Sequence, residues 1–207
     1  MKRLPQKTIE RLSAYRRTML SCMSKGKVYI YSYEIANLHN ITAVQVRRDI
    51  MLIGYSSTLK KGYEVKSLIN KINSILDTKD GLSAAVFGIG NLGKAITTYF
   101  NGKRSKLRIV AAFDVDPDKI GKVIAGVKCY SIAEMSKVIN EQNITIGILT
   151  IPSNNSAEIA DKLVNAGIKG ILNYTPTYLS VPSSVFLEEY DMVTSLEKVS
   201  YFVKQSL

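Results

Sequence analysis

The apolar positions of the first 80 residues recur at helical spacing and are separated by short polar turns. Ile9, Leu12 and Met19 share one helix face, so the pattern predicts a helix over residues 5–25. The run KVYIYS, residues 27–32, is rich in β-branched and aromatic side chains and predicts a short strand.

The next segment predicts a helix-turn-helix. YEIANLH is expected to be a short helix with Ser32 as its N-cap. After the turn HNI, Thr42 and Gln45 have the spacing of a capping box and predict the start of a second helix, AVQVRRDIMLIG. Arg47 and Arg48 lie in the first turns of that helix, the part of a helix-turn-helix that enters the major groove.

A short wing is predicted to follow the second helix. The segment YSSTLKKGYEV after Gly54 has polar residues between short apolar stretches, which indicates a β-hairpin with Lys60 and Lys61 near its tip. Residues 66–76 predict an amphipathic helix, and DTKDG, residues 77–81, predicts a linker. The first part of the chain is therefore expected to be a winged helix.

From residue 84 the pattern alternates between strands and helices. Uninterrupted apolar runs such as IVAAF and IGILTI are typical of parallel strands buried on both faces. The alternation predicts a Rossmann-like, doubly wound α/β parallel sheet. The predicted strands are 84–88, 108–114, 145–151 and 170–174, and the predicted helices are 91–101, 132–142 and 155–166.

The closing segment VTSLEKVSYFVKQSL predicts one more helix. Its apolar stripe has no evident place on its own chain and must be buried against something; the stripe consists of Val193, Leu196, Val199, Phe202 and Val203. The chain as a whole is expected to be α/β. It has a winged helix-turn-helix domain over 1–80, a Rossmann domain over 81–190 and a C-terminal helix over 191–207.

Charge changes this picture because it is concentrated in the first part of the chain. Residues 1–80 hold 15 Lys and Arg against 6 Asp and Glu, a net charge of +9, whereas the whole chain of 207 residues carries +11. A local cationic surface suits a polyanion, either nucleic acid or an anionic membrane face. A merely soluble basic domain is the alternative.

No stretch indicates a membrane span, a signal peptide or a metal site. The chain lacks a run of eighteen apolar residues, and its N-terminus lacks the apolar region of a signal peptide. Cys22 and Cys129 stand alone, in no metal-binding or redox spacing. We therefore expect a cytoplasmic protein with no metal.

A candidate dinucleotide site follows the first strand of the alternating part. The motif Gly88-x-Gly90-x-x-Gly93 comes after a strand and opens a helix. In such a turn the first glycine permits the sharp bend, the second admits the pyrophosphate and the third lets the helix pack closely on the sheet. The helix N-terminus then presents its free N–H groups to the phosphates.

An acidic residue at the end of the next strand would complete this site. Asp114 is placed to accept hydrogen bonds from the adenosine ribose, and Asp116 competes for the same role. A carboxylate there repels a 2′-phosphate, which favours NAD(H) over NADP(H). A structural turn without a ligand is the alternative.

The chain offers few residues with which to use such a cofactor in catalysis. Its single histidine, His39, lies in the basic part at the helix-turn-helix turn, and no Y-x-x-x-K pair occurs. Only one helix follows the Rossmann unit, so no substrate domain is expected there. Binding without evident turnover indicates a sensor and not an enzyme.

Taken together, these residues resemble the Rex redox-sensing transcriptional repressors, which bind operator DNA and respond to the NADH/NAD⁺ ratio. The resemblance covers nearly the whole chain. It rests on LPQKTIERLSAYRR, AVQVRRDI, KKGYEV, GIGNLGKA, IVAAFDVDPDKIG, ADKLVNAGIKGILNYTP and VPSSVFLEEYDMVTSLEKVSYFV.

The resemblance implies a homodimer that exchanges its C-terminal helices, which would bury the apolar stripe. It also implies a state-dependent polar set of Arg17, Tyr99 and Asp191. Met192 stands where the family usually has an aromatic residue near the nicotinamide. Further cofactor-facing positions implied by the resemblance are Asn91, Leu92, Pro152, Asn173 and Pro176.

The expected function is repression of transcription by a homodimer that binds double-stranded operator DNA and is released when NADH rises relative to NAD⁺, with the nucleotide as effector. Expected DNA contacts are Gln45, Arg47, Arg48, Lys60 and Lys61, although Gln45 could instead serve only the capping box. The wing and the MLIG segment depart from the family pattern, so operator sequence or affinity could differ. The alternatives are a small NAD-dependent oxidoreductase and a nucleotide- or CoA-binding accessory protein with a basic head.

Overall fold

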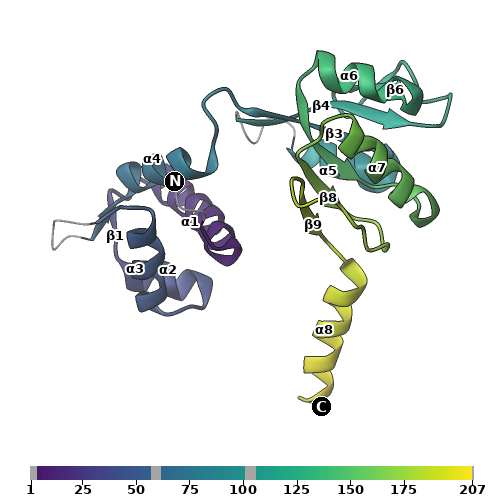
Figure 1. The fold of residues 1–207 in the computed structure, drawn as a ribbon. Helices are drawn as coiled ribbons and strands as arrows, with labels where there is room; N and C mark the ends of the chain where they lie inside the picture. The colour runs from purple at the N-terminus through teal and green to yellow at the C-terminus, as the bar shows by residue number, and fades with distance from the viewer. Residues whose placement is uncertain (1–3, 57–61, 101–105, 207) are drawn as a thin grey trace. The chain divides into compact units, whose positions relative to one another are not determined.

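The computed structural model describes residues 4–56, 62–100 and 106–206. It divides into two compact units, Met1–Lys79 and Asp80–Leu207 (Figure 1). Each unit has its own core.

The first unit consists of four helices and a two-stranded sheet among its described residues. They are α1 (Gln6–Ser24), β1 (Tyr29–Ile30), α2 (Ser32–His39), α3 (Ala43–Leu52), β2 (Tyr63–Glu64) and α4 (Val65–Leu76). The apolar stripes of the helices meet in one core, in which Leu12, Tyr15, Met19, Ile50 and Leu68 have no exposed surface. The predicted helices are confirmed; Leu12 and Met19 of the predicted face of α1 lie in the core, whereas Ile9 is exposed.

One local prediction in this unit is wrong. The N-cap of α2 is Tyr31 and not Ser32, because the Glu34 carboxylate accepts from the Tyr31 backbone N–H and α2 begins one residue earlier than expected. The described strand after α3, β2, pairs antiparallel with β1, which precedes the helix-turn-helix. Residues 57–61, which include the predicted wing tip, lie outside the described part of the chain.

The second unit contains a seven-stranded sheet in the order β5-β6-β4-β3-β7-β8-β9. All neighbouring strands are parallel except β5 and β6, which form an antiparallel pair. The strands are β3 (Leu82–Phe87), β4 (Leu107–Asp114), β5 (Val123–Ile124), β6 (Val127–Ser131), β7 (Ile144–Leu149), β8 (Gly170–Asn173) and β9 (Phe186–Glu189). The doubly wound parallel sheet is confirmed, with an antiparallel strand at one edge.

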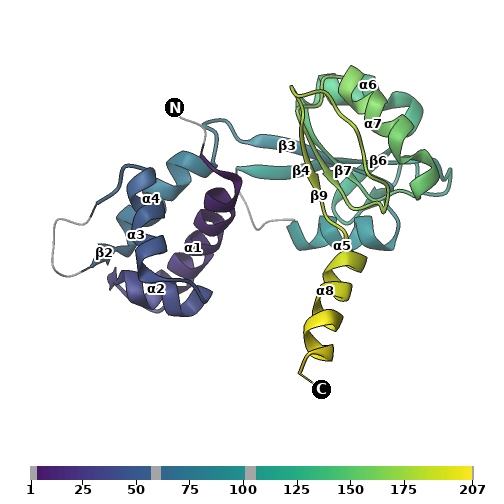
Figure 2. The same cartoon turned by 60° about the horizontal axis from the view of Figure 1, so that its bottom comes forward.

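Helices cover both faces of this sheet, as Figure 2 shows. They are α5 (Asn91–Phe100), η1 (Ile132–Glu134), α6 (Met135–Glu141), η2 (Ser153–Asn155) and α7 (Ser156–Asn165). Alternate residues of β3 point to opposite faces, as expected of a strand. Ala85 and Phe87 pack with α6 and α7, while Ala84 and Val86 pack with α5.

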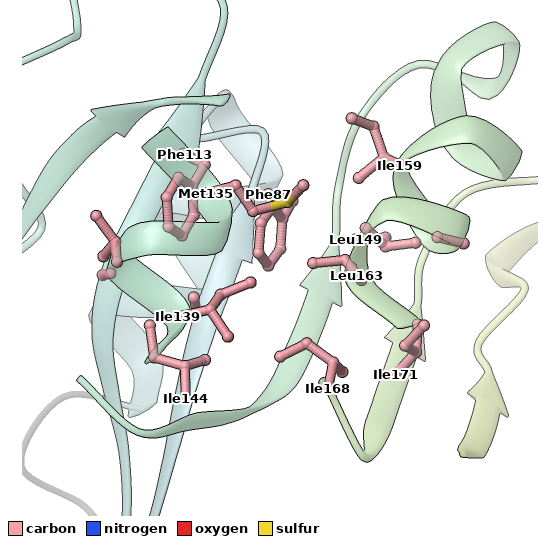
Figure 3. Close-up of a cluster of buried hydrophobic side chains, with 14 of the residues drawn as sticks. Phe87, Phe113, Met135, Ile139, Ile144, Leu149, Ile159, Leu163, Ile168 and Ile171 are labelled. Carbon is pink, nitrogen blue, oxygen red and sulfur yellow. The ribbon is translucent and has the colours of Figure 1, made fainter. Parts of the chain in front are cut away.

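The larger core lies between the sheet and helices α6 and α7 (Figure 3). Phe87 and Phe113, on the adjacent strands β3 and β4, stack with ring centroids 4.8 Å apart. Leu163 of α7 and Ile139 of α6 close over them. This packing holds the carboxyl ends of β3 and β4 in place beneath the glycine turn.

Three strands, β5, β6 and β9, were not predicted. Residues 125 and 126 form the turn between β5 and β6, and both have positive φ, 52° at Ala125 and 84° at Gly126. These strands contain two to five residues and lie at or beside the sheet edges, where alternation is too short to be recognised.

The last helix, α8 (Met192–Lys204), is drawn in yellow in Figure 1. None of its residues is buried, and all five members of the predicted stripe are at least half exposed. The apolar stripe of α8 is therefore not buried by the described part of its own chain.

Candidate nucleotide and DNA sites

The three glycines of the motif meet different surroundings. A Cβ added at Gly93 would lie 2.3 Å from the Gly88 carbonyl oxygen, and one added at Gly88 would lie 2.7 Å from Cγ2 of Ile151. Nothing lies within 4 Å of a Cβ at Gly90. Gly88 and Gly93 are thus required by the fold, whereas Gly90 borders open space that a ligand can approach.

The turn is fixed to the carboxyl ends of three parallel strands. The Gly88 N–H donates to the Phe113 carbonyl at 2.8 Å, and the Thr150 hydroxyl donates to the Gly88 carbonyl at 2.7 Å. The strand β3 lies between β4 and β7, where the winding of the sheet reverses direction. Ligands of doubly wound sheets bind at this point.

Asp114, at the end of β4, braces this turn. Its buried carboxylate accepts from the backbone N–H groups of Ile89 and Asp116, both at 3.0 Å, and pairs with the Lys119 ammonium at 3.0 Å. Burial alone would raise the pKa of Asp114, but these donors outweigh burial and lower its pKa. Of the roughly four acceptor positions of a carboxylate, three are therefore already used within the chain.

Asp116 is the more open of the two acidic candidates. Its side chain is 40% exposed; one oxygen accepts from the Asp118 N–H at 3.0 Å and the other lies 3.4 Å from the Lys119 ammonium. Lys119, which sequence reasoning did not select, thus joins both carboxylates. Its place in DVDPDKIG, three residues after Asp116, was the available signal.

The remaining predicted cofactor positions differ in exposure. Asn91 begins α5 and is exposed, and Leu92 packs partly on the smaller core. Pro152 and Pro176, which follow β7 and β8, are exposed. Asn173 is only 1% exposed; its amide donates to the Thr177 carbonyl and its oxygen accepts from Thr175. The Asn173 side chain thus holds the loop after β8, and its contact with a cofactor stays a prediction.

In the first unit the helix-turn-helix exposes one face of α3. Asn40 ends α2 in the left-handed conformation, and the Thr42 hydroxyl accepts from the Gln45 N–H at 3.1 Å to start α3. Arg47 and Arg48 are exposed, and the Arg47 guanidinium donates to the Ser32 hydroxyl at 3.1 Å. The two arginines are therefore placed for contact with a polyanion.

Gln45 takes a role that was not expected. Its side-chain amide donates to Asp49 at 2.9 Å, and of the predicted capping box only the hydrogen bond to the Thr42 hydroxyl forms. Asp49 is fully buried and also accepts from the Arg11 guanidinium at 2.6 and 2.8 Å and from the Tyr15 hydroxyl at 2.9 Å. We call Arg11, Tyr15, Gln45 and Asp49 the Asp49 cluster. It joins α3 to α1.

In the Asp49 cluster, the buried Asp49 carboxylate is kept in its charged form by its hydrogen-bond donors. Burial would raise the pKa of Asp49, but the hydrogen bonds from Arg11, Tyr15 and Gln45 lower it. Burial and the neighbouring carboxylate raise the pKa of Tyr15. The Asp49 cluster is therefore a charged anchor for α3, and Gln45 belongs to that anchor in this structure.

Two family models match the chain. One, described as putative DNA-binding protein N-terminus, matches residues 3–50, and the other, described as CoA binding domain, matches residues 79–177. Curated proteins named redox-sensing transcriptional repressor Rex are similar over almost the full length. Those of Leuconostoc citreum and Desulfitobacterium hafniense are 37% and 38% identical over 97% of this chain and 93% and 96% of their own. The chain belongs to the Rex family.

Solved Rex structures have the same fold. The crystal structure of RSP, a Rex-family repressor, in complex with β-NAD⁺ and operator DNA is 32% identical with a TM-score of 0.91, covering all of this chain and 95% of that one. RSP in complex with β-NADH is also 32% identical, with a TM-score of 0.86, covering all of this chain and 97% of the other. The similarity therefore includes both units.

The family's expected switch residues lie in different units. Arg17 is exposed on α1 of the first unit, whereas Tyr99 on α5 and Asp191 before α8 belong to the second. Asp191 caps α8 by accepting from the Val193 N–H at 2.8 Å, and Met192 is 53% exposed. Lys60 and Lys61 lie outside the described residues. The roles of these residues stay predictions.

Among the described residues, no cluster of three or more His, Cys, Asp or Glu side chains could hold a metal ion, and no helix is long and apolar enough to cross a membrane. Cys129 is buried, and burial raises the pKa of its thiol. His39 is hydrogen-bonded to Thr18 at 2.9 Å within the first unit.

Proposed function

We propose that this chain is a redox-sensing transcriptional repressor. As a cytoplasmic homodimer it binds double-stranded operator DNA, and a rise of NADH relative to NAD⁺ releases it. One observation carries the proposal: the chain matches, over both units, a repressor whose structures contain NADH or NAD⁺ with operator DNA. The nucleotide is an effector in this proposal and not a redox substrate, since the Rex relatives are named as repressors.

The glycine turn supports nucleotide binding at β3. The pyrophosphate would approach the backbone at Gly90, where space is open, and meet the N-terminus of α5, whose first N–H groups have no partner in the helix. Asp114 would hold the turn and accept at most one ribose hydroxyl, while Asp116 would accept the other. The bound nucleotide supplies a nicotinamide ring whose charge differs between its oxidised and reduced forms.

The exposed face of α3 supports DNA binding. Arg47 and Arg48 would contact bases or phosphates in the major groove, and Lys60 and Lys61 would contact the backbone. The apolar stripe of α8 would be buried by exchange with a second copy, because it is exposed on the single chain. Arg17, Tyr99, Asp191 and Met192 would then respond to the bound nucleotide.

The mechanism is a shift between two dimer arrangements. One would place both recognition helices on two half-sites, and the other, closed around NADH, would not. NADH can shift the balance only by the ratio of its affinities for the two arrangements. A ratio of about 10² corresponds to about 2.7 kcal/mol.

A titration on DNA tests the function. A duplex selected by the protein from a random pool is labelled, and its binding is followed by fluorescence anisotropy with NADH, NAD⁺, NADPH or CoA. We expect release by NADH at concentrations where the other three leave the complex intact. Release by CoA alone would favour an accessory CoA-binding protein, and NADH oxidation with added acceptors would favour an oxidoreductase.

A further inference from the structure

The exposed face of α3 contains an apolar residue next to its arginines. Val44, Arg47, Arg48 and Met51 are all exposed. Arg47 and Arg48 lie three and four residues after Val44, and Met51 lies four and three residues after them, so the four side chains share one helix face. The opposite face, with Val46, Asp49 and Ile50, is buried in the core of the first unit. The exposed face is the one that remains available to DNA.

The fold does not account for Val44. Its side chain is 54% exposed in the first turn of α3, and valine is a poor helix former. The polar neighbour Gln45 points elsewhere, since its amide is held by Asp49 at 2.9 Å. The first turn of α3 therefore presents a branched apolar group to the outside, one turn before Arg47 and Arg48.

We infer that Val44 determines operator specificity by contacting the methyl group of a thymine. Residues in the N-terminal part of a recognition helix reach the base edges. In the major groove, thymine presents a C5-methyl group, which apolar side chains recognise. Val44 would read this methyl group, and Arg47 and Arg48 would supply hydrogen bonds and charge. The inference rests on the proposed DNA binding and names a residue and a base feature for it.

Replacing thymine by deoxyuridine tests the inference, because it removes only the methyl group. The dimer first selects a duplex from a random pool. Each thymine of the half-site is then replaced in turn, symmetrically in both half-sites. Anisotropy gives the Kd of every duplex for the wild type, Val44→Ala and the control Met51→Ala, which shortens another exposed side chain on the same face of α3.

For the wild type we expect at least one thymine at which loss of the methyl group weakens binding about threefold to fivefold per half-site. In Val44→Ala this penalty should fall to about onefold, while Met51→Ala keeps it. The wild-type series needs no variant and is unaffected by folding defects. If no thymine replacement weakens wild-type binding, or if the weakening is the same in Val44→Ala as in the wild type, the inference is overturned while DNA binding stays intact. Failure to select any duplex would overturn the proposed function as well.

Discussion

At the residue scale, the glycines of the turn serve two different requirements, close packing within the fold and room for a ligand. The structure assigns close packing to Gly88 and Gly93 and leaves space beside Gly90. A substitution at Gly90 should therefore affect the ligand, and one at Gly93 should affect the fold.

We expect Gly90→Ala to keep its unfolding midpoint and to lose NADH affinity by about tenfold or more, because the new methyl group occupies the path of the pyrophosphate. Gly93→Ala should instead lower the free energy of unfolding by about 1–3 kcal/mol, because its Cβ meets the Gly88 carbonyl. Urea unfolding and NADH titration of both variants check this. Equal NADH affinity of Gly90→Ala and the wild type would contradict the position of the pyrophosphate.

The two acidic residues near the turn should also differ. Asp114→Asn removes the charge of a buried, threefold-bonded carboxylate, so both thermal stability and the preference for NADH over NADPH should fall. Asp116→Asn should lower the preference alone, because its side chain is 40% exposed. Melting curves and titrations with both nucleotides separate the two variants. Unchanged preference in both would show that neither carboxylate contacts the ribose.

The Asp49 cluster predicts a pH-dependent stability. Asp49 is buried with its partners, so Asp49→Asn should reduce the free energy of unfolding by about 2–3 kcal/mol at pH 7. Its pKa is lower in the folded chain than the ordinary value of about 3.9, so its contribution is present above pH 4 and is lost as the pH falls through the folded pKa.

Urea unfolding of wild type and Asp49→Asn between pH 7 and pH 2.5 measures this difference. The gap between them should narrow as the pH falls below about 4, because the wild-type carboxyl then begins to bind a proton. The exposed Glu10→Ala, on the same helix as Arg11, serves as a control with little effect at any pH. A gap that stays constant to pH 2.5 would mean that hydrogen bonding and not charge stabilises the cluster.

At the scale of elements, α8 has the pattern of a helix that needs a partner. Its apolar stripe is exposed, and Leu196, near the middle of the stripe, is 71% exposed. An apolar face of this kind on a single chain marks an interface.

Leu196→Ser should therefore weaken the dimer, and Lys198→Ser, the same replacement on the opposite helix face, should leave it intact. Sedimentation velocity over a concentration series measures the monomer fraction. We expect Leu196→Ser to dissociate at concentrations where the wild type and Lys198→Ser stay dimeric. If Leu196→Ser stays dimeric as well, α8 is not the interface.

At the scale of the whole molecule, nucleotide and DNA must influence each other equally. If NADH weakens DNA binding by some factor, DNA weakens NADH binding by the same factor. The intrinsic fluorescence of NADH allows its Kd to be measured with and without the selected duplex. We expect the ratio of NADH Kd values with and without DNA to equal, within error, the ratio of DNA Kd values with and without NADH. Unequal ratios would require a further species, such as monomers on DNA.

Much of this protein could be predicted from its sequence because the signals are local. Helical spacing located α1, α3 and α4, apolar runs located the central strands, and the glycine motif located the turn at Gly88. The departures arose where a short element or a single capping contact decided the outcome. Tyr31 replaced Ser32 as a cap, and the short strands β5, β6 and β9, at or beside the sheet edges, were missed.

The amino-acid sequence alone determined the order of the two units, the core faces of their helices and the site of the glycine turn, since each depends on neighbours within a few residues. Only the tertiary structure decided what Gln45, Asp114 and Asn173 do. Asp49, which holds Gln45, is itself held by Arg11, 38 positions away, and Asp114 bonds to Ile89 across 25. A polar side chain takes the partner that folding brings near, and burial makes that partner obligatory.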